Sequence, residues 1–260
     1  MTGVSRIIVF GGNGFVGSAI IAAALKRPGV EKIIGVCRSG ALNSEMHGLT
    51  KVPGYNDKVE WMKGDISQLG SSKSAKAAQE WEGEVAENTG VISCVGMFDT
   101  SNEVMRNMNG GANKCLVEVA KRSKAAHMVY ISAYEVENDL PFKVIPGYFE
   151  GKRIAEEAVH QEFGERGAIL QPGMVYGTRV HNGLSIPLGL LGAPLEALFT
   201  LPGLDQLQHK LPVIGKLVCS PPVSVHHVAQ TAVMAATGEL LGEEDRARVL
   251  SIDDIRRVGS

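Results

Sequence analysis

The chain has 260 residues, of which 44% are hydrophobic and 21% are charged, and its net charge is −2. This composition is typical of a globular protein with a hydrophobic core, and it excludes disordered and collagen-like chains. The near balance of 26 basic and 28 acidic residues gives no whole-chain basic field, which argues against a nucleic-acid-binding protein. The four cysteines are far apart and form no CxxC pair, so we expect a reducing compartment without structural zinc or disulfides. We interpret residues 1–260 as one domain.

The chain alternates between short apolar runs, typical of buried parallel strands, and longer helical patterns. This alternation predicts an α/β fold with a doubly wound parallel sheet covered on both faces. The expected strands are 6–10, 32–37, 59–63, 90–95, 127–132 and 168–171, and the expected helices are 15–27, 72–86, 103–124, 148–163 and 224–237.

The pattern changes after the last of these strands. Residues 180–222 are rich in Leu and Pro, and we expect a small C-terminal cap or insertion there. This segment either folds over the substrate site as a lid or faces a membrane, and Lys210 and Lys216 would favour anionic lipids next to residues 184–217. The few residues before the first strand leave no room for a signal or transit peptide within residues 1–260, and a precursor segment that has been cleaved off would not be visible in them.

Two charged or polar clusters near the end are given structural interpretations. His226 and His227 are adjacent and point to different helix faces, which favours packing or capping over metal binding. The charged residues Glu243, Asp245, Arg246 and Arg248 are expected to form a solvated tail.

The strongest local signal is a glycine pattern between the first strand and the first helix. Gly11 permits a tight turn, Gly14 lets the backbone approach a pyrophosphate, and Gly17 lets the helix pack closely on the sheet. The alternative is an ordinary glycine-rich turn. The residues predicted to contact a dinucleotide here are Gly11, Asn13, Gly14, Phe15, Val16 and Gly17.

The residues after the second strand indicate the type of dinucleotide. A site that prefers NAD would carry an acidic residue there to bind the ribose 2′-hydroxyl, but this chain has Arg38 and Ser39. These side chains favour the 2′-phosphate of NADPH, and NAD is the less favoured cofactor; the alternative is a solvated arginine on a loop.

Two further strand ends are candidates for the adenosine half of the cofactor. Asp65 and Ile66 follow the third strand, where the carboxylate could accept from the adenine amino group. Cys94, Val95 and Gly96 follow the fourth strand, where small residues would let the backbone meet the ribose. Either segment could also be a strand-ending turn.

Tyr148 and Lys152 stand four residues apart at the start of a predicted helix, so both project from one face. A neighbouring ammonium lowers the pKa of a phenol and favours its use as an acid–base group. Ser132, at the end of the preceding strand, could hold a substrate oxygen. The spacing of tyrosine and lysine also occurs by chance, and Tyr134 is a competing phenol.

Together these residues resemble the short-chain dehydrogenases/reductases, in their extended or atypical branch. Residues 108–113 look like the NxxGTxN segment of that branch, and residues 171–177 look like its RPGxVYG segment. The resemblance implies a Rossmann fold in which Pro172 and Gly173 also contact the cofactor. Within the superfamily, residues 92–96, residues 147–153 and the Leu/Pro-rich cap look like those of a plant plastid NAD(P)-binding group. That group is similar to a fungal coenzyme Q biosynthesis factor and to the dehydrogenase-like accessory subunit of mitochondrial complex I.

The resemblance implies an oxidoreductase that transfers hydride between NADPH and a small apolar carbonyl or quinone-like substrate. Tyr148 would carry the proton, Lys152 would tune the phenol and bind ribose, and Ser132 would orient the oxygen. Gln171 stands where sugar-nucleotide enzymes carry arginine, so a nucleotide-sugar substrate is less expected.

The alternative that the narrower resemblance implies is a catalytically silent, NADPH-holding accessory or assembly subunit of a membrane complex. Both interpretations place the protein in a mitochondrion or chloroplast, in soluble form or at a membrane surface. Without a preceding transit peptide it would be cytoplasmic.

Overall fold

A computed structural model describes residues 3–42, 48–69, 79–134, 145–181, 184–187, 222–243 and 245–260 of the chain. Within these residues, one sheet contains the strands β1 (Arg6–Phe10), β2 (Lys32–Cys37), β3 (Val59–Lys63), β4 (Thr89–Ser93), β5 (His127–Ile131), β6 (Gly167–Leu170) and β11 (Arg248–Leu250). All of its neighbouring strands are parallel, in the order β11-β6-β5-β4-β1-β2-β3. The strand order reverses between β1 and β4, and open sheets of this kind bind ligands at such a switch point, outside the carboxyl ends of the strands.

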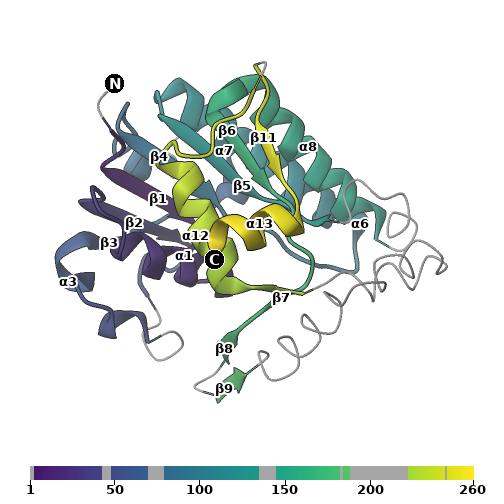
Figure 1. Cartoon of the computed structure of the whole chain (residues 1–260). Helices are drawn as coiled ribbons and strands as arrows, with labels where there is room; N and C mark the ends of the chain where they lie inside the picture. Colours follow the sequence, from purple (N-terminus) through teal and green to yellow (C-terminus); the bar gives the residue numbers. More distant parts are fainter. Residues whose placement is uncertain are drawn as a thin grey trace.

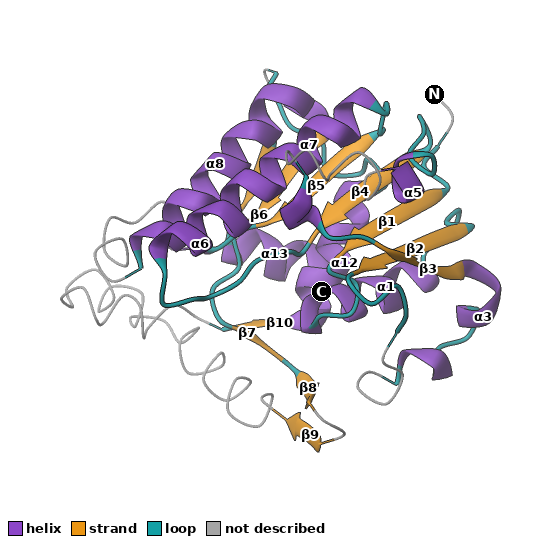
Figure 2. Ribbon diagram, turned by 180° about the vertical axis from the view of Figure 1, so that it is seen from behind, coloured by secondary structure: helices purple, strands orange, loops and turns teal. Residues whose placement is uncertain are grey.

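Helices cover both faces of this sheet, as Figures 1 and 2 show from opposite sides. One layer contains α1 (Phe15–Leu25), α12 (Val225–Ala236) and α13 (Ile252–Gly259). The other contains α6 (Asn102–Arg106), the π-helical turn η3 (Asn107–Gly111), α7 (Ala112–Arg122) and α8 (Pro146–Phe163). The predicted doubly wound α/β fold is therefore confirmed.

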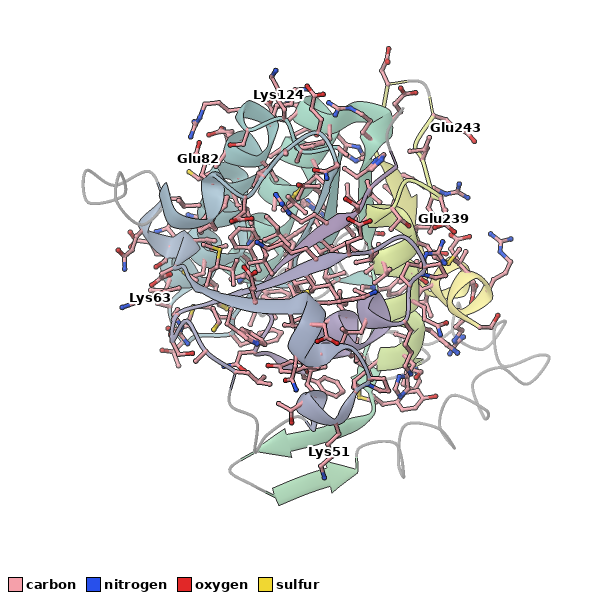
Figure 3. All side chains as sticks on the ribbon, turned by 90° about the vertical axis from the view of Figure 1, so that its left-hand side faces the viewer. Lys51, Lys63, Glu82, Lys124, Glu239 and Glu243 are labelled. Carbon is pink, nitrogen blue, oxygen red and sulfur yellow. The ribbon has the colours of Figure 1, made fainter. Side chains whose placement is uncertain are left out.

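Alternation of side chains along each strand divides the core into two parts. Ile7 and Val9 of β1 belong to the cluster under α1 and α12, whereas Ile8 and Phe10 belong to the cluster under α7 and α8. All four side chains are buried, as expected for a strand covered on both faces. The labelled lysine and glutamate side chains, by contrast, point outward around the rim of the molecule (Figure 3).

Short elements connect these layers. They are η1 (Leu49–Lys51), α3 (Tyr55–Lys58), η2 (Ile66–Gln68), α5 (Gln79–Glu82) and η6 (Gly164–Arg166). Beyond the main sheet, β7 (Val175–Tyr176) pairs in parallel with β10 (Val223–Ser224), and β8 (Thr178–His181) pairs antiparallel with β9 (Leu184–Pro187).

The C-terminal end corrects one expectation. Arg248 does not belong to a solvated tail, because it begins β11, which pairs with β6 at the edge of the sheet. Asp245 and Arg246 are exposed. The next helix, α13, begins with a capping box in which Ser251 and Asp254 each bond to the other's backbone amide. Three residues are too few for a clear strand pattern, so only the pairing with β6 reveals this edge.

Two predicted helices differ from the structure. The helix expected over residues 103–124 is interrupted by the π-turn at Asn107–Gly111. Of the helix expected over 72–86, residues 72–78 lie outside the described residues, and α5 ends at Glu82, before Gly83.

The expected cap falls mostly outside the described residues. Within 180–222, the structure describes only 180–181, 184–187 and 222, so Lys210, Lys216 and the expected lid or membrane-facing surface lie outside it. None of the helices in the described ranges has the length and apolar character needed to cross a bilayer.

Candidate active site

The turn between β1 and α1 has the shape that the glycine pattern predicts. Gly11 adopts a positive φ of 80°, which other residues rarely adopt. A Cβ on Gly17 would lie 2.2 Å from the carbonyl oxygen of Gly11, so only glycine fits there. The amide of Gly14 donates to the same oxygen at 2.9 Å.

The first turn of α1 is open to an anion. Its N-cap is Gly14, which has no side chain to occupy the free amides, and Phe15, Val16 and Gly17 add no acidic group. Helix N-terminal amides in this state bind phosphate through their hydrogens and the helix dipole. Apart from its chain neighbours, the Gly11 oxygen at 3.1 Å is the one described atom within 4 Å of a Cβ placed on Gly14, so no described side chain covers the backbone there.

The loop after β2 lies against this turn. Asn13 donates through Nδ2 to the carbonyl oxygen of Ala41 at 3.2 Å, and Ser39 donates to the same oxygen at 2.9 Å. Arg38 is exposed, and its charge acts on Asp65 across the loop. Asn13 of the glycine turn and Ser39 of the β2 loop thus share one acceptor, next to Arg38.

Asp65 has a clear structural role. It is the N-cap of η2, and its carboxylate accepts from the Ser67 amide at 3.0 Å and from the Ser67 hydroxyl at 2.7 Å. Burial opposes ionisation, but the hydrogen bonds from Ser67 and Gln68 and the charge of Arg38 outweigh it and lower the pKa of Asp65. Ile66 is buried in the core beneath α7.

The loop after β4 lies at the switch point, directly beside the glycine turn. A Cβ on Gly11 would lie 3.4 Å from the backbone of Cys94 and from the side chain of Val95. Burial raises the pKa of the Cys94 thiol to about 12, although the charge of Lys152 opposes the rise. The thiol is thus protonated and unreactive near neutral pH.

A buried polar network fixes this loop. The Asn109 side chain accepts from the Met97 amide at 3.1 Å and donates to the Met97 carbonyl at 2.9 Å. Asn113 accepts from the Ser93 hydroxyl at 2.6 Å and donates to the Val95 carbonyl at 3.2 Å. Both asparagines belong to the segment around the π-turn, a feature common at functional sites.

Neither the periodicity nor the residue spacing of the sequence predicts this network. The resemblance of residues 108–113 to a family segment is the signal that pointed to the region, but it assigned no partners to Asn109 or Asn113. The hydrogen bonds that they make to Met97 and Val95 span 12 and 18 residues, which no local pattern encodes.

Lys152 of α8 extends into the same region. Only 4% of the residue is exposed, its Nζ donates to the Ile131 carbonyl at 2.9 Å, and a Cβ on Gly96 would lie 3.4 Å from that nitrogen. Burial lowers the pKa of Lys152 to about 8, although the negative charge of Glu156 opposes the fall. The amine can therefore exchange a proton near physiological pH.

Tyr148 lies one helical turn before Lys152. The lysine Nζ is 5.6 Å from the centre of the Tyr148 ring, and Tyr148 packs with Ala133 and Phe149. The exposed Phe98 stacks on it, with ring centres 4.3 Å apart and an angle of 13° between the ring planes.

Ser132 is the third predicted catalytic residue, at the end of β5. It is 5% exposed, and its buried Oγ has no hydrogen-bond partner among the described residues. A buried hydroxyl without a partner is costly, which is consistent with a position that a substrate oxygen would complete. Tyr134, the competing phenol, packs against the core cluster under α1 and α12.

The loop after β6 completes the site. Pro172 is buried and its carbonyl accepts from the Tyr134 amide at 3.0 Å, while Gly173 is half-buried. Before them, Gln171 is buried and donates through Nε2 to the Glu156 carboxylate at 3.1 Å. Sequence reasoning noticed Gln171 but missed Glu156, although its position four residues after Lys152 on the same helix face was a usable signal.

The comparisons agree with this architecture. Residues 7–190 match the model of the NAD dependent epimerase/dehydratase family. The chain belongs to this family. Because the match includes the glycine turn, Ser132, Tyr148 and Lys152, the whole site lies within the family region.

One curated relative and two solved structures illustrate these similarities. An uncharacterized chloroplastic protein of Arabidopsis thaliana is 33% identical over 98% of this chain and 77% of its own length. The UDP-glucuronic acid 4-epimerase of Bacillus cereus, solved with NAD, superposes with a TM-score of 0.57 at 18% identity, covering 95% of this chain and 78% of the epimerase. An oxidoreductase of Lactococcus lactis superposes with a TM-score of 0.58 at 14% identity, covering 97% and 96%. At these identities the solved structures support the fold.

Proposed function

We propose that this family member is an NADPH-dependent oxidoreductase that reduces or oxidises a small apolar carbonyl or quinone-like compound. The observation that carries the proposal is the arrangement at the carboxyl edge of the sheet. Lys152 of α8 reaches the ends of β4 and β5, and Tyr148 lies one helical turn before it. The Ser132 hydroxyl, which has no partner among the described residues, follows β5, and the glycine turn after β1 contacts the same β4 loop.

The residues present suit a nicotinamide dinucleotide. The open first turn of α1 would hold the pyrophosphate, and the Arg38 guanidinium would hold a 2′-phosphate, to which the Ser39 hydroxyl would donate after turning from the Ala41 carbonyl. Lys152, beside Gly96, would bind the nicotinamide ribose. The epimerase of Bacillus cereus was solved with NAD, which supports a cofactor of this class, and Arg38 is our reason for choosing NADPH.

The chemistry follows from the positions of the side chains. A bound nicotinamide would supply or accept the hydride. The Tyr148 hydroxyl would give a proton to the substrate oxygen or take it back, and the Lys152 ammonium would stabilise the phenolate. Ser132 would donate its hydroxyl hydrogen to the same oxygen and so orient the carbonyl.

The exposed aromatic and thioether side chains favour an apolar substrate. Phe98 is 69% exposed and Met174 is 54% exposed, and they lie on the loops after β4 and β6 at the edge of the sheet where the site is found. A planar conjugated ring would gain stacking contact with Phe98.

The same exposed residues support a second candidate, an accessory subunit that holds the cofactor without turnover. Phe98 and Met174 would then contact a partner in a membrane complex rather than a substrate. The chloroplastic relative supports an organellar location under either proposal.

The test is direct. The purified protein is titrated calorimetrically with NADPH and NADH, and NADPH oxidation is followed at 340 nm with a short-chain quinone and with an aromatic aldehyde. Tighter binding of NADPH together with turnover of either compound supports the oxidoreductase. Tight binding without turnover favours the accessory subunit, and equal affinities would contradict the assigned role of Arg38.

A further inference from the structure

The pair Glu156 and Gln171 contributes no group to the proposed hydride or proton transfer. Gln171 is 4% exposed and donates to the Glu156 carboxylate at 3.1 Å. An amide donor holds the carboxylate in place but adds no positive charge, so the negative charge of Glu156 is not neutralised by this contact.

Glu156 shares a helix face with Lys152. Residues four apart in an α-helix are neighbours, and the lysine amine lies in a buried, weakly polar environment where a nearby charge acts strongly. Because of the four-residue spacing and the burial of Lys152, we expect the negative charge of Glu156 to favour the protonated form of the amine.

The remaining groups around Lys152 do not supply such a charge. From β5, Tyr130 is neutral because burial raises its pKa well above the usual value, and the Ile131 carbonyl accepts from the amine. From the loop after β4, the Cys94 thiol is protonated, and Tyr148 of α8 presents its ring to the amine. Among the charged groups that the described residues bring to this amine, Glu156 is the acidic one.

We propose that Glu156, held by the Gln171 amide, is a positioning residue that acts through Lys152 and keeps its buried amine protonated. Its importance for turnover rests on the proposed function. The charge effect on Lys152 does not, because it follows from the geometry of the protein alone.

Because Lys152 is buried, its amine changes its protonation state near physiological pH. Burial by itself drives the amine toward its neutral form, and the charge of Glu156 opposes that tendency, with a resulting pKa of about 8. Loss of the carboxylate charge would leave the amine largely neutral near pH 7.5. A neutral amine would neither favour the Tyr148 phenolate nor strengthen a hydrogen bond to ribose.

The experiment replaces the charge without replacing the contact. In Glu156→Gln, the new amide oxygen can still accept from Gln171, so this hydrogen bond and the size of the side chain are kept while the charge is lost. Glu157→Gln is the matched control, because it removes an exposed charge one residue along the same helix. Glu156→Asp keeps the charge and serves as the conservative rescue.

The primary readout is the protonation midpoint of Lys152, measured by NMR with ¹³Cε-labelled lysine and assigned by the signal that Lys152→Arg lacks. We expect the midpoint to fall by about one pH unit in Glu156→Gln. It should stay unchanged in Glu157→Gln and return toward the wild-type value in Glu156→Asp. An unchanged midpoint in Glu156→Gln, or an equal shift in Glu157→Gln, would overturn the inference.

A second readout connects the effect to the cofactor. NADPH affinity should be roughly threefold weaker in Glu156→Gln than in the wild type at about pH 7.5. At about pH 6 the two affinities should be nearly equal, because the Lys152 amine is then protonated in both proteins. If the wild-type protein binds no NADPH, the proposed function fails, while the NMR midpoint still decides the role of Glu156.

Discussion

The two sides of the candidate site are built in different ways. The phosphate side is a local structure, in which glycines within seven residues set the turn and the start of α1. The proton-transfer side joins Ser132 of the β5 loop, Tyr148 and Lys152 of α8, and the loop after β4, so it exists only after the sheet has formed. A local motif can therefore predict where a cofactor would bind, whereas the proton transfer depends on contacts between segments that are distant in the chain.

The largest effect expected on the assembled side is that of Tyr148→Phe. Loss of the hydroxyl removes the proton donor, so turnover of a carbonyl or quinone substrate should fall by about 10²- to 10⁴-fold. NADPH binding should remain unchanged by calorimetry. Tyr134→Phe is the comparison, since that phenol packs against the core; if it instead abolishes turnover, the two tyrosines have been assigned the wrong roles.

The largest effect expected on the local side is that of Gly17→Ala. The added Cβ would lie 2.2 Å from the Gly11 oxygen and 2.9 Å from the Cα of Gly12, so the turn or the helix must shift. We expect a loss of about 3 kcal/mol in unfolding free energy and loss of NADPH binding. Chemical denaturation measures the first effect, with Gly83→Ala as the control because, chain neighbours apart, no atom of the described residues lies within 4 Å of its added Cβ.

Arg38→Ala tests whether, on the phosphate side, the Arg38 guanidinium is what favours NADPH over NADH. The charged contact to a 2′-phosphate is worth roughly 1.5–3 kcal/mol, which is about 10- to 150-fold in NADPH affinity. NADH affinity should hardly change. Arg122→Ala, which removes an arginine that pairs with Glu82, is the control. If Arg38→Ala lowers the affinities for NADPH and NADH equally, the Arg38 guanidinium does not bind the 2′-phosphate.

The smallest expected effect concerns the edge strand β11. His160 of α8 accepts through Nδ1 from the Ala247 amide at 3.2 Å, next to β11. Burial and the charge of Arg246 lower the pKa of His160, against the effect of Glu157. Protonation thus favours the unfolded chain, so this stabilisation is present above the unfolded pKa of about 6.5 and is lost as the pH falls below it.

The pH-dependent contribution of His160 to the unfolding free energy is small because the side chain is only half-buried and solvent screens its interactions with nearby charges. In His160→Gln, the loss of unfolding free energy between about pH 7.5 and pH 5.5 should be smaller than in the wild type by less than about 1 kcal/mol. Exposed His226 provides the matched His226→Gln control. A steeper loss in His160→Gln would reverse the assigned sign.

Sequence reasoning predicted most of the fold because the strands are apolar runs with clear ends. β1 and β2 have the predicted bounds, and α8 begins two residues before its expected start. It failed at β11, whose three residues are too short to show a period, and at the π-turn, because a π-turn leaves no periodic signature of its own. In the site, too, the residue that belongs to a local pattern, Lys152, was predicted. Glu156 and the contacts of Asn109 and Asn113 were not.

The sequence by itself therefore determined the alternation of strands and helices, the glycine turn and the tyrosine–lysine spacing, because each depends on residues near one another in the chain. Only the tertiary structure decided which groups meet. It buried Lys152 beside the β4 loop, left the Ser132 hydroxyl without a partner among the described residues and joined Gln171 to Glu156. Burial and the charges of neighbouring segments set the proton affinity of Lys152, and neither is a property of a local stretch of sequence.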